Sequence, residues 1–201
     1  YFRDRGISER TIDHFGLGVI TQWGKPFIAL PFYSNTDQVL CGVRLRASGG
    51  KWSRKSVKGS TFKGASFGLD TIVGHELAVI AEGEFNALSI WQALDGLGVA
   101  ADVLSVGSEG ALKRMSEPII RTHCGAAKSL IVWADKVTKG DEVREAIALI
   151  RPDLAVVVLH SKEIQGRKGK TDANDLLLAG NLTALMTHVL PMIAPKQETS
   201  A

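Results

Sequence analysis

From Gly74 onward, short apolar runs alternate with segments whose apolar residues recur at helical spacing. The run 77–81 is apolar throughout, which is typical of a buried strand. The next segment places apolar residues on one helix face, at Ala87, Ile90, Trp91 and Leu94. Alternation of this kind indicates βαβ units, so the sequence predicts an α/β fold whose mostly parallel sheet is covered by flanking helices.

Three more segments predict strands: 102–106 is strand-like, and 130–134 and 154–159 are apolar runs. The last run is apolar throughout, which is typical of a central parallel strand. Helical spacing predicts a helix over 111–117, a helix behind Thr138 as N-cap, and two helical pieces of 172–190 around Gly180. We expect the chain from Pro191 onward to be a frayed end or a linker.

The first 70 residues have a different pattern, with short apolar runs broken by turn residues. Ser8 is the expected N-cap of a helix over 9–15, which two following glycines end. The runs 27–33 and 39–45 predict antiparallel strands. The sequence therefore predicts three parts: a smaller basic α+β subdomain over 1–70, the α/β domain over 71–180, and a C-terminal helix with a linker or tail over 181–201.

Charge is distributed unevenly between these parts. Residues 1–70 contain 11 Lys or Arg against 5 Asp or Glu, whereas residues 71–201 contain 13 against 16. Uneven charge of this kind indicates that the basic part has an anionic partner.

Other features of the sequence exclude several classes of protein. A run of 18 apolar residues is absent, so we expect no membrane span. The two cysteines, Cys41 and Cys124, lie too far apart for a disulfide scaffold or a zinc finger. No secretory leader precedes Tyr1, so a reducing cytoplasm is the expected compartment, and the missing initial Met suggests an excised fragment.

Acidic residues follow three of the predicted strands. Glu82 and Glu84 follow the first, Asp135 follows the third, and Asp172 and Asp175 come after the last. The carboxyl ends of parallel strands share one edge of a sheet, where ligands gather. Two carboxylates about 4 Å apart repel by roughly 4 kcal/mol at an effective dielectric constant of 20, and Mg²⁺ relieves such repulsion. The alternative is that these side chains only stabilise helix starts through the helix dipole.

Several motifs accompany these carboxylates. They are EGEFNALS at 82–89, WAD at 133–135 and KTDANDLL at 170–177, with IALPF at 28–32, GVRLR at 42–46 and FGL at 67–69 in the basic part. Together they resemble the Toprim-containing RNA-polymerase domain of DNA primases, both DnaG-type bacterial primases and phage-type primase–helicases. The resemblance covers about residues 1–180 and would make 71–180 the Toprim domain.

The resemblance implies an enzyme, a nucleotidyltransferase of DNA replication that acts in the primosome. It would build RNA primers from nucleoside triphosphates on single-stranded DNA with Mg²⁺ or Mn²⁺, beside a helicase domain or a helicase partner. Glu82 and Asp135 would be catalytic. The cation would be held by Glu82, Asp135, Asp172 and Asn174.

Two positions depart from the family pattern, and each removes a negative charge. Val137 stands where the family has the second aspartate of an Asp-x-Asp motif, and Asn86 stands where the family often has an acidic residue. Fewer carboxylates bind Mg²⁺ more weakly. The alternative function is therefore a degenerate Toprim module that binds single-stranded DNA for an associated helicase or polymerase.

A basic stretch over 44–63 contains no acidic residue. Its predicted contacts to nucleic acid or nucleotide are Arg44, Arg46, Lys51, Trp52, Arg54, Lys55, Lys58 and Lys63. The alternative is a solvated hairpin. Lys170 ends a basic loop that is expected to touch phosphate, and Ile164 occupies the first glycine position of a P-loop, which argues against that motif.

Overall fold

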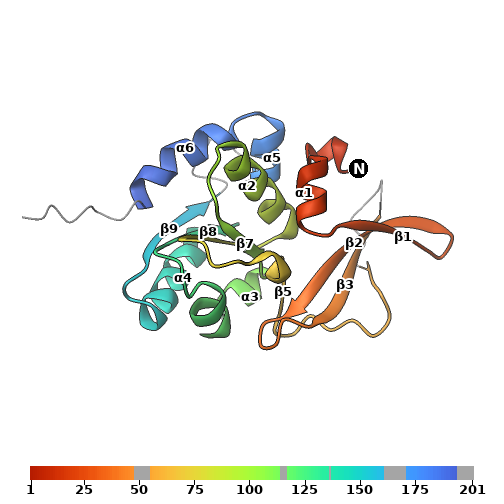
Figure 1. Cartoon of the computed structure of the whole chain (residues 1–201), viewed down its shortest axis with the longest axis horizontal. Coiled ribbons are helices and arrows are strands. Elements are labelled where there is room, and N and C mark those ends of the chain that lie inside the picture. Colours follow the sequence, from red (N-terminus) through yellow and green to blue (C-terminus); the bar gives the residue numbers. More distant parts are fainter. Residues whose placement is uncertain (48–54, 114–116, 136, 161–170, 194–201) are drawn as a thin grey trace, which may run out of the picture.

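The computed structural model describes residues 1–47, 55–113, 117–135, 137–160 and 171–193, and Lys51, Trp52, Arg54 and Lys170 lie outside them. Its strands form one nine-stranded sheet in the order β4-β3-β2-β5-β7-β6-β8-β9, with β1 paired to β2 (Figure 1). Within the described residues, no helix is long and apolar enough to span a membrane.

Four strands form the parallel part of this sheet: β6 (Leu77–Ala81), β7 (Asp102–Ser105), β8 (Ser129–Ala134) and β9 (Ala155–His160). The predicted parallel sheet is thereby confirmed. The predicted central position of the last strand is wrong, because β9 ends the strand order of the described sheet. Helices α4 and α6 both contact β9, so helices cover this strand although it lies at the end of the strand order. Its valines pack under these helices, which is why its sequence resembles that of a central strand.

Helices cover both faces of the parallel part (Figure 1). One face packs against α2 (Glu84–Gly96), α5 (Ala173–Leu178) and α6 (Leu182–Ile193). The other packs against α3 (Glu109–Lys113), the π-helical turn η3 (Ile119–His123) and α4 (Val137–Ile150). The sheet therefore lies between two apolar cores, as the sequence predicts for an α/β fold.

Two predicted helix limits are wrong. The described part of the predicted helix over 111–117 is helical up to Lys113 in α3, and the turn η3 begins at Ile119. Thr138 lies inside α4, which begins at Val137, so it is not the N-cap. Helix α6 continues through Pro191 because Val189 and Ile193, four residues apart, are both buried against the core.

The N-terminal part begins with η1 (Arg3–Arg5) and α1 (Glu9–His14), and its strands are antiparallel: β1 (Gly18–Gln22), β2 (Lys25–Ser34), β3 (Leu40–Ala47), β4 (Lys55–Ser56) and β5 (Ala65–Phe67). The 3-10 turn η2 (Leu69–Thr71) follows. Ser8 caps α1 by accepting from the Thr11 N–H at 3.2 Å, as predicted. Strand β1 was not predicted, because Gly18 at its first position was interpreted as part of the end of the preceding helix.

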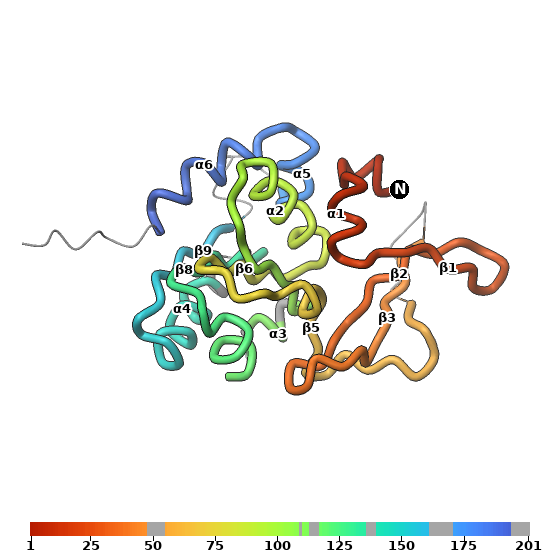
Figure 2. Tube along the Cα trace, viewed as in Figure 1, coloured from red at the N-terminus to blue at the C-terminus, as the bar shows by residue number. Residues whose placement is uncertain are grey.

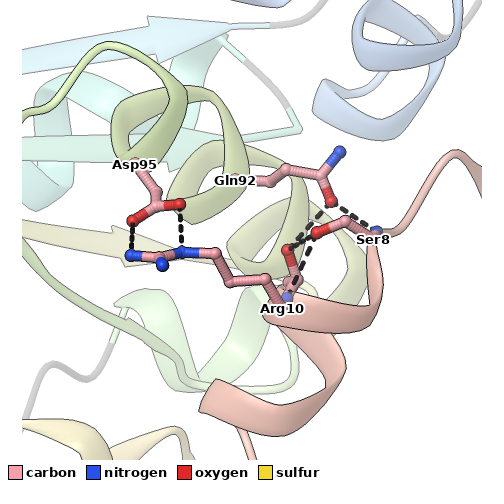
Figure 3. A network of polar contacts seen from close by, with 5 residues as sticks. Ser8, Arg10, Gln92 and Asp95 are labelled. Atoms are coloured by element: carbon pink, nitrogen blue, oxygen red, sulfur yellow. Dashed lines mark hydrogen bonds and ion pairs between the residues drawn. The ribbon is translucent and has the colours of Figure 1, made fainter.

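The basic part and the parallel part share the sheet. Strand β5 pairs with β2 through Phe32 and Phe67, and with β7 through Phe67 and Ser105. Helix α1 also docks on α2, where Gln92 Oε1 accepts from the Ser8 N–H at 2.7 Å (Figure 3). The boundary at residue 70 therefore stays a prediction, and the strand pairing crosses it.

The contact between α4 and β9 depends on a glycine. A Cβ at Gly140 would lie 2.5 Å from the His160 ring, so we expect Gly140→Ala to destabilise the fold by about 1–3 kcal/mol through overpacking. Gly96→Ala is the matched control, since a Cβ there meets nothing within 4 Å. It should instead stabilise by about 0.5–1 kcal/mol. Urea unfolding of both variants measures the difference, and equal stabilities would contradict the close packing of α4.

Candidate active site

Two acidic residues, Glu82 and Asp135, directly follow neighbouring strands at the carboxyl edge of the sheet. Strands β6 and β8 pair in parallel with Ala81 opposite Trp133, so the residues after them are neighbours. The Asp135 N–H donates to Glu82 Oε2 at 3.1 Å, and the Glu82 N–H donates to the Trp133 carbonyl at 3.1 Å. The structure therefore brings Glu82 and Asp135 together.

A third carboxylate approaches from α5. Asp172 is the N-cap of this helix and forms a capping box with Asp175, whose N–H donates to Asp172 Oδ1 at 2.8 Å. Burial raises the pKa of the Asp172 carboxyl, and the nearby charges of Asp175 and Asp135 raise it further. The N–H of Ala173, the next residue, donates to Asn86 Oδ1 at 3.2 Å, so the start of α5 lies against the first turn of α2, which follows Glu82.

Asn174 is fully buried behind this edge. Its Oδ1 accepts from the Arg5 guanidinium at 3.2 Å, and its Nδ2 donates to the Arg5 carbonyl at 2.8 Å and to Ser89 Oγ at 3.0 Å. These bonds join the N-terminal turn to α2 and α5. The geometry favours a supporting role for Asn174, and its predicted role as a metal ligand stays a prediction.

Asn86 has a role that the sequence did not reveal. Its side chain is buried, and its Oδ1 accepts from the Ala173 N–H at 3.2 Å, at the first residue of α5. This bond fixes the start of the helix that carries Asp172. The amide at position 86 therefore helps to position the third carboxylate.

The donors at this edge suit a hard cation. Mg²⁺ prefers oxygen ligands and is commonly bound by one or two carboxylates, with water and substrate phosphates completing its shell. Glu82 and Asp135 are the residues that could hold it, with Asp172 as a third donor. Within the described parts of the chain, no group of three or more His, Cys, Asp or Glu is arranged to hold a metal ion.

A buried ion cluster lies next to the acidic edge. Glu84, the first residue of α2, is 3% exposed. Its two carboxylate oxygens accept from Arg44 and from Arg46, the latter at 3.1 Å, and both arginines belong to β3. The cluster joins the basic strands to the helix that follows Glu82. Arg44 and Arg46 are thus bound to a carboxylate within the protein, which the sequence did not predict.

A pocket of about 730 Å³ opens beside this cluster. The Arg44 guanidinium lies over the rings of Phe32 and Phe62, at 4.5 and 5.0 Å from their centroids, and reaches the Gly107 carbonyl at 3.4 Å. Gly107 has φ +76°, and a Cβ there would lie 3.1 Å from Phe32, so this turn requires glycine. Further lining residues include Asn35, Lys63, Ser66, Ser108 and Ala111.

The pocket wall combines positive charge with uncommitted polar atoms. Arg44 and Lys63 line the pocket and no acidic side chain is among the described lining residues, so the wall carries net positive charge. Asn35 Oδ1 and Ser66 Oγ are buried and have no hydrogen-bond partner among the described residues. These two residues could not be predicted from the sequence, because neither belongs to a motif. A ligand with phosphate and hydrogen-bonding groups would suit this wall.

The remaining predicted basic contacts are exposed. Lys58 lies in the turn after β4, and Lys55 belongs to β4. The Lys55 ammonium lies 4.7 Å from the centroid of the Trp23 ring. The structure therefore places Lys63 in the pocket, whereas Lys55 lies at a separate aromatic contact.

Comparison with known proteins gives matches among solved structures. No protein-family model matches this sequence, and no curated protein matches it significantly. The primase fragment of the bacteriophage T7 primase–helicase protein matches with a TM-score of 0.68 and 20% identity, covering 93% of this chain and 72% of that chain. The chain has a primase fold. At this identity the likeness shows the fold alone, and it confirms the predicted α/β architecture.

A second match comes from a structure of the T7 lagging-strand DNA polymerase interacting with primase domains of two subunits bound to an RNA/DNA hybrid and dTTP. The matched chain has a TM-score of 0.68 and 20% identity, and the alignment covers 94% of this chain and 89% of that chain. Nearly the whole of this chain therefore takes part in the primase fold.

The raised pKa of Asp172 predicts opposite effects on stability and on function. Folding raises the pKa of Asp172 above its value in the unfolded chain. The free energy of unfolding therefore falls as pH rises between these two pKa values, and the loss is complete above the folded pKa. Asn is as good an N-cap as Asp. We therefore expect Asp172→Asn to unfold at equal or higher urea concentration at pH 7 but to bind Mn²⁺ more weakly.

The comparison variant is Asp175→Asn, which removes one charge from the exposed residue of the capping box but leaves the buried Asp172 carboxyl able to ionise. Urea titrations at pH 4 and pH 7 give the pH dependence. A lower stability of Asp172→Asn at pH 7 would show that burial and like-charge repulsion do not destabilise the ionised Asp172.

Proposed function

We propose that this chain is the catalytic core of a DNA primase, which joins nucleoside triphosphates into short RNA primers on a single-stranded DNA template. The observation that carries the proposal is the contact between Glu82 and Asp135 at the carboxyl edge of a sheet with a primase fold. The basic pocket beside it supplies a place for the substrate.

The proposed reaction is attack by the primer 3′-hydroxyl on the α-phosphate of a nucleoside triphosphate, with pyrophosphate leaving. Arg44 and Lys63 would bind the triphosphate, while the backbone at Gly107 closes the pocket beside it. Glu82 would accept the proton of the attacking hydroxyl or hold the cation. Positioning and charge neutralisation supply most of the catalysis in phosphoryl transfer.

Mg²⁺ or Mn²⁺ belongs to the proposal as cofactor. Glu82 and Asp135 would hold it, and Asp172 would complete the set of donors. When bound, the cation neutralises charge on the phosphates and lowers the pKa of a bound hydroxyl. The like-charge effect of Asp135 on the pKa of Asp172 supports a site that gains from a cation.

The proposed partners are single-stranded DNA, nucleoside triphosphates and a helicase domain or helicase partner. The T7 fragment belongs to a primase–helicase protein, and the T7 primase domains are described with an RNA/DNA hybrid and dTTP. Both descriptions concern those proteins. They support the proposal through the shared fold.

A degenerate module that binds single-stranded DNA is the second candidate function. Two observations favour it: Asn86 serves α5 rather than adding negative charge, and the described residues hold no metal group of three side chains. Titration of the chain with Mn²⁺ separates the two functions. Binding at millimolar or lower concentration that depends on Glu82 would argue against the degenerate module.

Primer synthesis tests the proposal directly. Labelled nucleoside triphosphates are incubated with the chain and single-stranded DNA, with Mg²⁺ or Mn²⁺ and with a chelator as control. Products that depend on template and cation support the proposal. Absence of product together with absence of Mn²⁺ binding would overturn it.

A further inference from the structure

A tryptophan occupies the tip of the β1–β2 hairpin. Gln22 pairs with Lys25, so Trp23 and Gly24 form a two-residue turn, and both have positive φ, 52° and 69°. This is the pattern of a type I′ turn, which prefers Asn or Gly at both positions. Trp is unfavourable in this conformation. Turn geometry therefore does not explain the tryptophan.

Packing does not explain it either. Trp23 is 61% exposed, which is far from the buried state of Trp91 and Trp133. The hairpin extends away from the parallel strands and their helices (Figure 2). A large aromatic ring is thus held in solvent at a projecting turn, where it gives the fold little apolar burial.

Two neighbours nevertheless fix the orientation of the ring. Phe27 of β2 contacts it edge to face, with centroids 5.6 Å apart and an interplanar angle of 84°. The Lys55 ammonium of β4 lies 4.7 Å from the Trp23 centroid and 5.6 Å from that of Phe27. The tip therefore presents an ordered aromatic surface next to a positive charge.

The segment of sequence that carries this surface has a charge that suits a nucleic acid. Between residues 14 and 69 the sequence has eight Lys or Arg and a single acidic residue, Asp37. Exposed Lys25 directly follows the turn. Aromatic rings that stack on bases, beside cations that contact phosphates, are the usual means of binding single-stranded nucleic acids. An apolar protein partner would not need this excess of positive charge.

We propose that Trp23 is a base-stacking platform for single-stranded DNA and that Lys55 contacts an adjoining phosphate. The proposal rests on the proposed function, because its ligand is the template of that reaction. It adds a template contact at the hairpin tip, apart from the pocket lined by Arg44 and Lys63. The tip would hold a template base that is not being copied.

The test uses Trp23→Asn, because Asn suits the turn. We expect its melting temperature to equal or exceed that of the unmodified chain, while its dissociation constant for a labelled oligothymidylate rises roughly 5- to 150-fold, as expected for 1–3 kcal/mol per stacked base. Trp23→Phe should keep most of the affinity, since a ring remains. Fluorescence anisotropy at fixed salt measures all three proteins.

Two further variants sharpen the result. Val19→Thr removes another exposed apolar side chain of the same hairpin and should leave oligonucleotide affinity unchanged. Lys55→Gln should reduce the slope of log affinity against log salt by about 0.7, the value for one phosphate contact to a single strand. Unchanged oligonucleotide affinity of Trp23→Asn would overturn the proposal, as would an equal loss in Val19→Thr.

The outcome is independent of catalysis. We expect Trp23→Asn to bind Mn²⁺ and nucleoside triphosphates as the unmodified chain does. If the chain makes no primers but Trp23→Asn still loses oligonucleotide affinity, the proposed function fails and the platform stands. If primer synthesis is intact and the affinity of Trp23→Asn is unchanged, the platform alone fails.

Discussion

Glu82→Gln and Asp135→Asn are each expected to lower primer synthesis by at least about 100-fold, the loss typical of removing one group that stabilises charge in a transition state. Both substitutions keep the shape of the side chain and remove one negative charge. A Gln at position 82 can still accept from the Asp135 N–H, so the fold should be retained. Single-turnover primer extension with saturating nucleotide measures the effect.

The matched control is Glu145→Gln, which removes one charge from the exposed face of α4. Its activity should stay within about twofold of the unmodified chain, since surface substitutions away from the site usually have small effects. Full activity in both Glu82→Gln and Asp135→Asn would remove this edge of the sheet from the catalytic site. Circular dichroism and urea unfolding establish that each variant folds.

Glu84→Gln is expected to destabilise the chain by about 3–5 kcal/mol, the usual cost of breaking a buried ion pair from one side. The carboxylate is 3% exposed and pairs with both Arg44 and Arg46, so its loss removes a buried countercharge from two largely buried guanidinium groups. The midpoint of urea unfolding should fall accordingly. Nucleotide affinity should be measured at low temperature, where the variant remains folded.

Asp95→Asn gives the comparison for an exposed pair. Arg10 donates to Asp95 through two nitrogens, at 2.7 and 2.8 Å, on the surface between α1 and α2 (Figure 3). Exposed pairs contribute about 0–1 kcal/mol, so this variant should be nearly as stable as the unmodified chain. Similar losses in Glu84→Gln and Asp95→Asn would show that burial does not amplify the cluster at Glu84.

The sequence predicts the parallel part of the fold well because its periodicity is local. Strand β6 lies where the apolar run places it, and Ser8 caps α1 because capping depends on residues within one turn. The position of β9 could not be predicted from its apolarity, because α4 and α6 cover it at the edge of the sheet. Strand order depends on contacts that are distant in sequence.

The candidate site also has contacts that could be predicted from the sequence and contacts that could not. The meeting of Glu82 and Asp135 follows from a rule about strand ends, so it could be expected before the fold was known. The pairing of Glu84 with Arg44 and Arg46 could not, because it joins a helix start to a strand some 40 residues earlier. The sequence predicted that Arg44 contacts an external anion, whereas in the fold Arg44 is paired with the carboxylate of Glu84.

Strand β5 has a consequence for how the proposed substrates would be selected. It pairs with β2 on one side and β7 on the other, so the walls of the basic pocket and the acidic edge belong to one hydrogen-bonded sheet. Many enzymes that transfer phosphoryl groups assemble their sites by closing one lobe over another. Here backbone pairing sets the spacing between the cations proposed to bind phosphate and the carboxylates, without any nucleotide. Discrimination among nucleotides would then depend on fit to a preformed site rather than on lobe closure.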